Sequence, residues 1–175
     1  MERRTARILR AVAAALVFVT AAYHLWWGFP RSLVYLQAFG GGIPPDPRPF
    51  LFVALALALL AGPYLVTRNV VTLRNAYVGG TLLLVGSIAA WVTWHATGHG
   101  AFLVDGLAAP APDDSGHSHG NTALLILDHF DTEPVETAIK TVETAAVAIF
   151  VTLLWKDPAI VPKDRTTERG EASET

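Results

Sequence analysis

Hydrophobic residues are concentrated in four long blocks, which are separated by shorter polar stretches. The blocks run over about residues 11–29, 49–67, 76–96 and 134–155. A helix needs about 20 apolar residues to cross the core of a bilayer, and each block reaches about that length. The first three blocks contain no Asp, Glu, Lys or Arg. Three uncharged blocks are hard to enclose in one small soluble core, so the pattern predicts an all-α, polytopic integral membrane four-helix bundle.

The polar stretches divide the chain into loops and a tail. Residues 1–156 are expected to form one four-helix domain, with outer loops at 30–48 and 97–133. Apolar residues at roughly helical spacing within each loop predict short interfacial helices on the outer side, near 33–39 and 121–130. The polar, Glu-rich tail 157–175 is expected to be disordered and cytoplasmic.

The first block has two interpretations. Four arginines precede it, and Thr20-Ala21-Ala22 resembles the cleavage site of a secretory signal peptide. However, the apolar run continues through Trp27, which makes it longer than the 7 to 15 residues of such a signal. A retained helix is therefore favoured over a cleaved signal peptide.

The distribution of basic residues predicts the orientation in the cell membrane. With the N-terminus in the cytoplasm, ten of the thirteen Lys and Arg residues fall on the inner side. Arg31 and Arg48 remain outside, and Lys140 lies within the fourth block. The positive-inside rule then places both termini in the cytoplasm.

Composition excludes several classes of function. The chain is 52% hydrophobic and 16% charged, with a net charge of −2 and no cysteine. Disorder throughout, a basic nucleic-acid-binding surface and any thiolate chemistry are therefore excluded. No motif for a nucleotide-binding loop, a hydrolase or a zinc protease occurs, so an enzyme acting on its own is not expected.

All six histidines fall on the outer side in this topology. They are candidate metal ligands: His24, His95, His99, His117, His119 and His129. His95 and His99 are four residues apart and share a helix face, and His24 is expected at a similar depth on another helix. The prediction is a centre shared by these three, holding haem b, copper or zinc. The alternative is that the histidines are interfacial residues at headgroup level, with no ligand.

The fourth block carries a charged face. Glu136, Lys140 and Glu143 follow one another at steps of four and three, so they share one side of a helix. A charge costs about 2.5 to 3.5 kcal/mol inside a bilayer, so these groups should face one another, the bundle interior or water. The alternative is that the helix leaves the membrane early, with only Glu143 inside.

One resemblance to a known group of proteins is present. The segments His24-Leu25-Trp26-Trp27-Gly28-Phe29-Pro30-Arg31 and Asp46-Pro47-Arg48-Pro49 resemble small uncharacterised four-helix membrane proteins of halophilic archaea. The excess of Arg over Lys and the acidic tail agree with that source. The resemblance implies a membrane bundle and no activity.

Two functions compete at this stage, and a third, a minor transporter or proton-conducting protein, is less favoured because the four short helices include no broken one. The first is a small membrane subunit with an outward-facing His-ligated metal or haem site, acting in redox chemistry or metal handling. The second is a cofactor-free accessory or assembly subunit, whose polar face on the fourth helix docks a larger complex. Both imply contact with membrane lipid and with other membrane subunits or further copies of the chain.

Overall fold

The computed structural model describes residues 1–37, 46–96 and 133–160. These ranges contain four α-helices and no strand, as the hydrophobic pattern predicts. The helices are α1 (Arg3–Gln37), α2 (Arg48–Thr67), α3 (Leu73–Ala96) and α6 (Pro134–Lys156). Each is long and apolar enough to cross a membrane, so the chain is a multi-pass membrane protein with an all-α fold.

The surface and the interior confirm this class of protein. Large apolar side chains point outward, with Phe18 64% and Leu82 67% exposed. Ionisable side chains are found inside, where His24 is 1% and Glu143 0% exposed. A soluble bundle has the reverse arrangement, because water stabilises exposed charges and favours the burial of apolar groups. The outer surface is therefore built to contact lipid.

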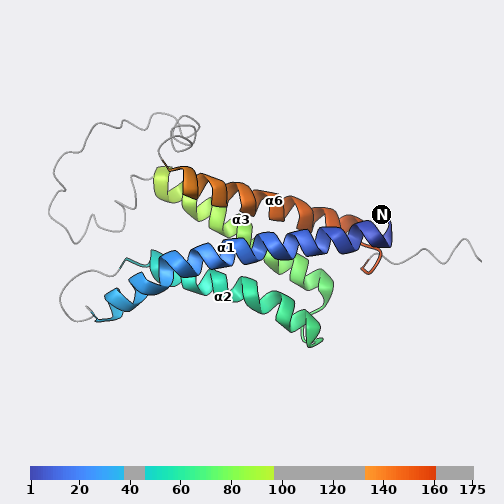
Figure 1. Ribbon diagram of the computed structural model, residues 1–175, viewed down its shortest axis with the longest axis horizontal. Helices are drawn as coiled ribbons and strands as arrows, with labels where there is room; N and C mark the ends of the chain where they lie inside the picture. Colours follow the sequence, from blue (N-terminus) through green and yellow to red (C-terminus); the bar gives the residue numbers. More distant parts are fainter. Residues whose placement is uncertain (38–45, 97–132, 161–175) are drawn as a thin grey trace, which may run out of the picture.

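The helices alternate in direction and form a ring in which α1 contacts α2 and α6, and α3 contacts α2 and α6. Figure 1 shows the start of α1 and the end of α6 at one end of the bundle. We call this the Arg10 end. The opposite end, where α3 finishes and α6 begins, is called the His95 end.

The helix α1 is longer than the sequence pattern predicts. It continues through Pro30 to Gln37, so the predicted loop 30–48 begins at least eight residues too early. The apolar stretch predicted as a separate interfacial helix near 33–39 is, up to Gln37, the last part of α1. The predicted loop begins at Pro30, but interior prolines are tolerated in membrane helices. The other predicted interfacial helix, 121–130, lies outside the described residues.

The link between α2 and α3 is short because a backbone motif ends α2 sharply. Asn69 adopts a positive φ of 56°. Its N–H bonds the carbonyl of Val66, and the N–H of Val70 bonds that of Leu65, both at 3.0 Å. This Schellman arrangement satisfies the last carbonyls of α2 and turns the chain toward α3.

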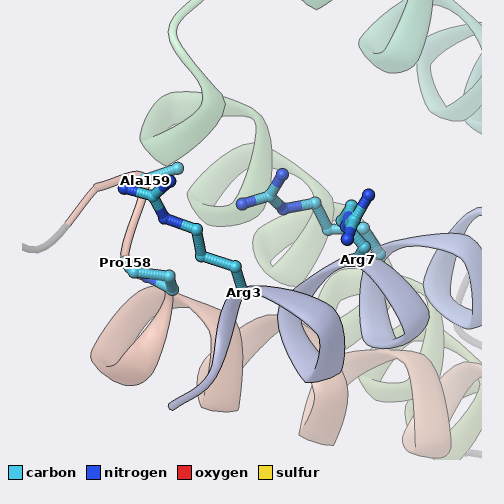
Figure 2. Close-up of a pocket in the computed structure, with 5 residues that line it drawn as sticks. Arg3, Arg7, Pro158 and Ala159 are labelled. Carbon is cyan, nitrogen blue, oxygen red and sulfur yellow. The ribbon is translucent and has the colours of Figure 1, made fainter.

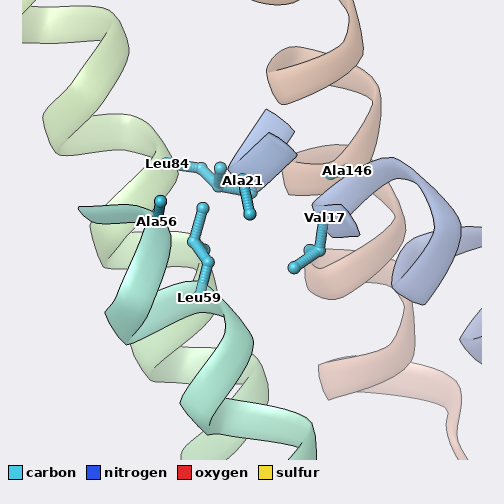
Figure 3. Packing of buried hydrophobic residues seen from close by; sticks show 6 residues of the cluster. All are labelled: Val17, Ala21, Ala56, Leu59, Leu84 and Ala146. Carbon is cyan, nitrogen blue, oxygen red and sulfur yellow. The ribbon is translucent and has the colours of Figure 1, made fainter. Parts of the chain in front are cut away.

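The apolar core draws on all four helices. Figure 3 shows the cluster, which consists of Val17, Ala21, Ala56, Leu59, Leu84 and Ala146. Three of the six are alanines, which let membrane helices approach closely. Glycine has the same role at two helix crossings. Where α1 meets α2, a Cβ on Gly28 would lie 2.8 Å from the carbonyl oxygen of Pro49. Where α3 meets α6, a Cβ on Gly80 would lie 2.6 Å from the ring of Phe150.

A polar clamp joins α1, α3 and the end of α6 at the Arg10 end. Asp157 is fully buried and accepts hydrogen bonds from Arg10 Nε at 2.9 Å and from the hydroxyl of Tyr77 at 2.8 Å. The N–H of Ala159 adds a third donor at 2.9 Å. Burial raises the pKa of Asp157, but these donors outweigh burial and hold its pKa below the ordinary value. The prediction that the disordered tail begins at 157 is therefore wrong, because Asp157 is part of the fold.

Candidate functional site

Two polar stripes face each other along the contact between α3 and α6. One stripe starts with Glu133 at the N-cap of α6 and continues along α6 with Glu136, Lys140 and Glu143. The other, on α3, consists of Ser87, Trp91 and His95. Steps of three and four residues keep each stripe on one side of its helix. The two helices are antiparallel, so the residues pair in order from the His95 end toward the middle of the bundle. We call this set of residues, together with His24 of α1, the polar seam.

The deepest layer of the seam surrounds Glu143. Lys140 Nζ lies 2.8 Å from Glu143 Oε2 and donates to Ser87 Oγ at 2.9 Å. The Ser87 hydroxyl donates in turn to Glu143 Oε1 at 3.2 Å. A charge buried in an apolar bundle is costly unless it is paired and hydrogen-bonded, and this triangle supplies both. The charged face of α6 is thus turned to α3 and not to lipid.

His24 brings α1 into the same layer. Its Nδ1 lies 2.8 Å from the carbonyl oxygen of Thr20, so Nδ1 carries the proton, since a carbonyl only accepts. Its Nε2 faces Glu143 Oε1 at 3.6 Å, beyond direct hydrogen-bonding distance. The ring of Phe52 packs edge-on against the imidazole, with 4.7 Å between centroids. His24 is therefore fixed with one nitrogen directed at a buried carboxylate.

The middle layer pairs an indole with a carboxylate. Trp91 Nε1 donates to Glu136 Oε2 at 3.1 Å. The carbonyl of the same Trp91 lies 2.8 Å from His95 Nδ1. Trp91 thus fixes the side chains of both Glu136 and His95, one through its ring and the other through its backbone.

The layer at the His95 end brings three groups with metal-ligating atoms close together. His95, Glu133 and Glu136 each offer one ligand atom, and these atoms lie within 4.8 Å of one another. His95 is buried, and its Nε2 lies 4.0 Å from Glu133 Oε2. The bond from Nδ1 to a backbone carbonyl leaves Nε2 as the coordinating nitrogen, the usual outer support of a ligating histidine. One imidazole and two carboxylates suit Zn²⁺ and similar divalent ions.

The predicted three-histidine centre is not assembled from its described members. His24 faces Glu143 and His95 faces Glu133, and these carboxylates are separated by ten residues of α6, or about 15 Å. The two histidines therefore lie in different layers of the seam. Four further histidines lie outside the described residues, namely His99, His117, His119 and His129. His24 and His95 are both buried within the bundle. The alternative that they sit at headgroup level stays a prediction.

Several members of the seam escaped sequence reasoning. Ser87 and Trp91 were not selected, although they precede His95 at a regular spacing of four residues. Glu133 is the last residue of the predicted loop 97–133, and the structure places it at the N-cap of α6 beside His95, with its side chain 42% exposed. The four-residue spacing of Ser87, Trp91 and His95 is the sequence feature that indicates a polar face on α3.

Comparison with protein-family models, with curated proteins and with solved structures found no match. The resemblance to membrane proteins of halophilic archaea stays a prediction.

Proposed function

We propose that the protein is a small membrane subunit that handles a divalent transition metal at the His95 end. The observation that carries the proposal is the convergence of His95, Glu133 and Glu136. The support of His95 Nδ1 by a carbonyl and of Glu136 by Trp91 adds the outer hydrogen bonds expected around ligands. Zn²⁺ is the ion that best fits this ligand set, whereas haem iron is held by groups such as His, Met, Cys or Tyr and not by a pair of carboxylates.

The proposed orientation follows from the basic residues. Arg3, Arg7 and Arg10 lie together at the Arg10 end, which the positive-inside rule assigns to the cytoplasm of a cell membrane. The metal site then faces outward, where free ions arrive without crossing the membrane. A reporter that is active only in the cytoplasm should work when fused after Thr175 and fail when inserted at Ser115.

Redox chemistry and transport receive less support from the described residues. Below Glu143 and His24 the bundle is closed by the apolar cluster that includes Leu84 and Ala146. The seam therefore reaches about half way through the part of the chain that the structure describes. Capture or relay of an ion at one surface agrees better with this arrangement than conduction across the membrane.

The accessory-subunit alternative loses its main argument. It required the polar face of α6 to be available for a partner, but Lys140 and Glu143 are bonded to one another and to Ser87. A docking role would have to use the apolar surface instead. This alternative becomes the better one if no metal binds.

The experiment is a titration of the purified full-length chain with Zn²⁺, followed by calorimetry and by the shift in unfolding temperature. We expect binding by the parent protein, with a loss of affinity of at least about tenfold in His95→Ala and in Glu133→Gln. Glu2→Gln, an exposed carboxylate at the opposite end, is the matched control and should bind normally.

A second control separates the seam from the loop histidines. In the double variant His117→Ala/His119→Ala, the affinity for Zn²⁺ should stay within about twofold of the parent value if the seam holds the ion. Loss of binding in that variant, together with normal binding by His95→Ala, would assign the metal to the loop and overturn the proposal.

A further inference from the structure

A pocket lined by arginines lies at the Arg10 end, opposite the proposed metal site. It has a volume of about 520 Å³ and is lined by Arg3, Arg7, Arg10, Pro158 and Ala159. The three arginines follow at steps of four and three and share one face of α1. Figure 2 shows Arg3 extending from α1 toward Ala159, with Arg7 further along the same helix.

The pocket has an excess of positive charge. Arg10 is paired with Asp157, which uses one of the three positive charges. Within residues 1–37, 46–96 and 133–160, Arg3 and Arg7 form no ion pair with a carboxylate. The lining therefore keeps two positive charges after Asp157 is counted. Guanidinium groups are suited to phosphate, because their planar array of donors binds two oxygens at once.

An apolar cleft adjoins the pocket at Arg10. It has a volume of about 340 Å³ and lies between α1, α2 and α3, with Phe150 of α6 at its wall. Arg10 lines both the pocket and the cleft. Below Arg10 the cleft wall is made of small and aliphatic side chains, among them Ala13, Val17 and Leu59. In Figure 1, α2 diverges from α1 toward this end.

Two glycines in the cleft wall mark open space. A Cβ added to Gly62 or Gly79 would meet no atom within 4 Å. Both residues line the cleft, one on α2 and the other on α3. Within the part of the chain that the structure describes, nothing fills the space beside these two glycines.

We infer that the Arg10 end binds one anionic phospholipid, with its phosphate in the arginine pocket and an acyl chain in the apolar cleft. A positive pocket that continues into an apolar cleft matches the two parts of such a molecule, and free phosphate would use only the first part. The volume of the cleft falls within the range of ordinary ligand sites. The lipid belongs to the leaflet at the Arg10 end, where basic residues attract anionic headgroups. This site is independent of the proposed metal site, which lies at the other end of the bundle.

The test measures lipid retention by native mass spectrometry of the full-length chain in micelles. Phosphatidylglycerol, phosphatidylcholine and inorganic phosphate are supplied in separate arms. We expect phosphatidylglycerol to be retained at the lowest concentration. The double variant Arg3→Gln/Arg7→Gln should weaken its binding by about thirtyfold, since each arginine contributes about a factor of five at such a surface.

A matched pair of glycine variants tests the cleft. Gly79→Leu places a side chain in the open space of the cleft and should weaken phosphatidylglycerol binding by about tenfold or more. Gly86→Leu is the control, because Gly86 lies on the same helix with equally open surroundings but outside the cleft. Binding by Gly86→Leu should equal that of the parent.

Three outcomes would overturn the inference. Equal retention of phosphatidylcholine and phosphatidylglycerol would show that the arginines do not select the ligand. Binding of inorganic phosphate with the same affinity, unaffected by Gly79→Leu, would reduce the site to an anion pocket without a lipid chain. Retention of no lipid by the parent protein would leave the cleft to another occupant, such as a helix of a second protein.

Discussion

Two fully buried carboxylates, Asp157 at the Arg10 end and Glu143 in the polar seam, differ in how they are bonded. Asp157 accepts from two guanidinium nitrogens of Arg10, from the Tyr77 hydroxyl and from the Ala159 N–H. Glu143 accepts from Lys140 and, at 3.2 Å, from Ser87, and it faces a third group at 3.6 Å, His24 Nε2. A carboxylate with all its acceptor positions filled acts as a structural clamp. One with remaining capacity can exchange hydrogen-bond partners.

The sharpest test of this difference replaces each carboxylate by the amide that has the same shape. We expect Asp157→Asn to lower the free energy of unfolding by about 3 kcal/mol, because Arg10 and Tyr77 lose a charged acceptor in a buried place. Arg10 is one-third exposed, which keeps the loss near the lower limit for buried pairs. Glu143→Gln should cost about 1 kcal/mol, because its remaining oxygen still accepts from Lys140 or Ser87. Thermal or denaturant unfolding in one detergent measures both, and equal losses would remove the distinction.

The pH dependence of the same clamp gives a second test. The folded-state pKa of Asp157 lies below its unfolded value of about 3.9, so its contribution is complete above about pH 5. As the pH falls below 4 and through the folded pKa, the contribution is lost. The difference in unfolding free energy between the parent and Asp157→Asn should therefore be constant from pH 5 to 7 and shrink below pH 4. A difference that stays constant down to pH 2 would contradict this prediction.

The smallest expected effect concerns two serines, of which Ser87 is half-buried and Ser32 is buried. Ser87→Ala removes the hydroxyl that links Lys140 to Glu143 and should cost about 1 kcal/mol of unfolding free energy. Ser32→Ala is the matched control, because the Ser32 hydroxyl is buried with no hydrogen-bond partner among the described residues. Its removal should be neutral or slightly stabilising. If both substitutions have the same effect, the Ser87 bridge does not strengthen the seam.

The sequence predicts the helices well because each carries its own signal. About 20 apolar residues in a row make a membrane helix whatever its neighbours are, so α2, α3 and α6 begin and end within a few residues of the predicted positions. The predicted boundaries are wrong at Pro30 and Asp157. At both positions the local sequence favours the end of the ordered structure, but packing keeps the residue within the fold. Asp157 is buried only because Arg10 lies 147 residues away in the chain and beside it in space.

The site is less predictable because it depends on how α3 and α6 are rotated about their axes. The spacing of Glu136, Lys140 and Glu143 shows that they share a face, but not that Ser87 and Trp91 stand opposite. The same limit applies to His24 and His95. Their similar expected depth suggested one centre, whereas α6 offers each of them a different carboxylate.

The inward polar face of α6 has a consequence for the biogenesis of the protein. On its own in a bilayer, α6 would expose Glu136, Lys140 and Glu143 to lipid at about 2.5 to 3.5 kcal/mol for each charge near the centre. Ser87, Trp91 and His24 belong to helices that precede α6 in the chain, so they emerge from the ribosome before it. Insertion of α6 can therefore proceed directly against a polar surface that α1 and α3 have already formed. The order of the helices in the chain is then also the order in which they insert into the membrane.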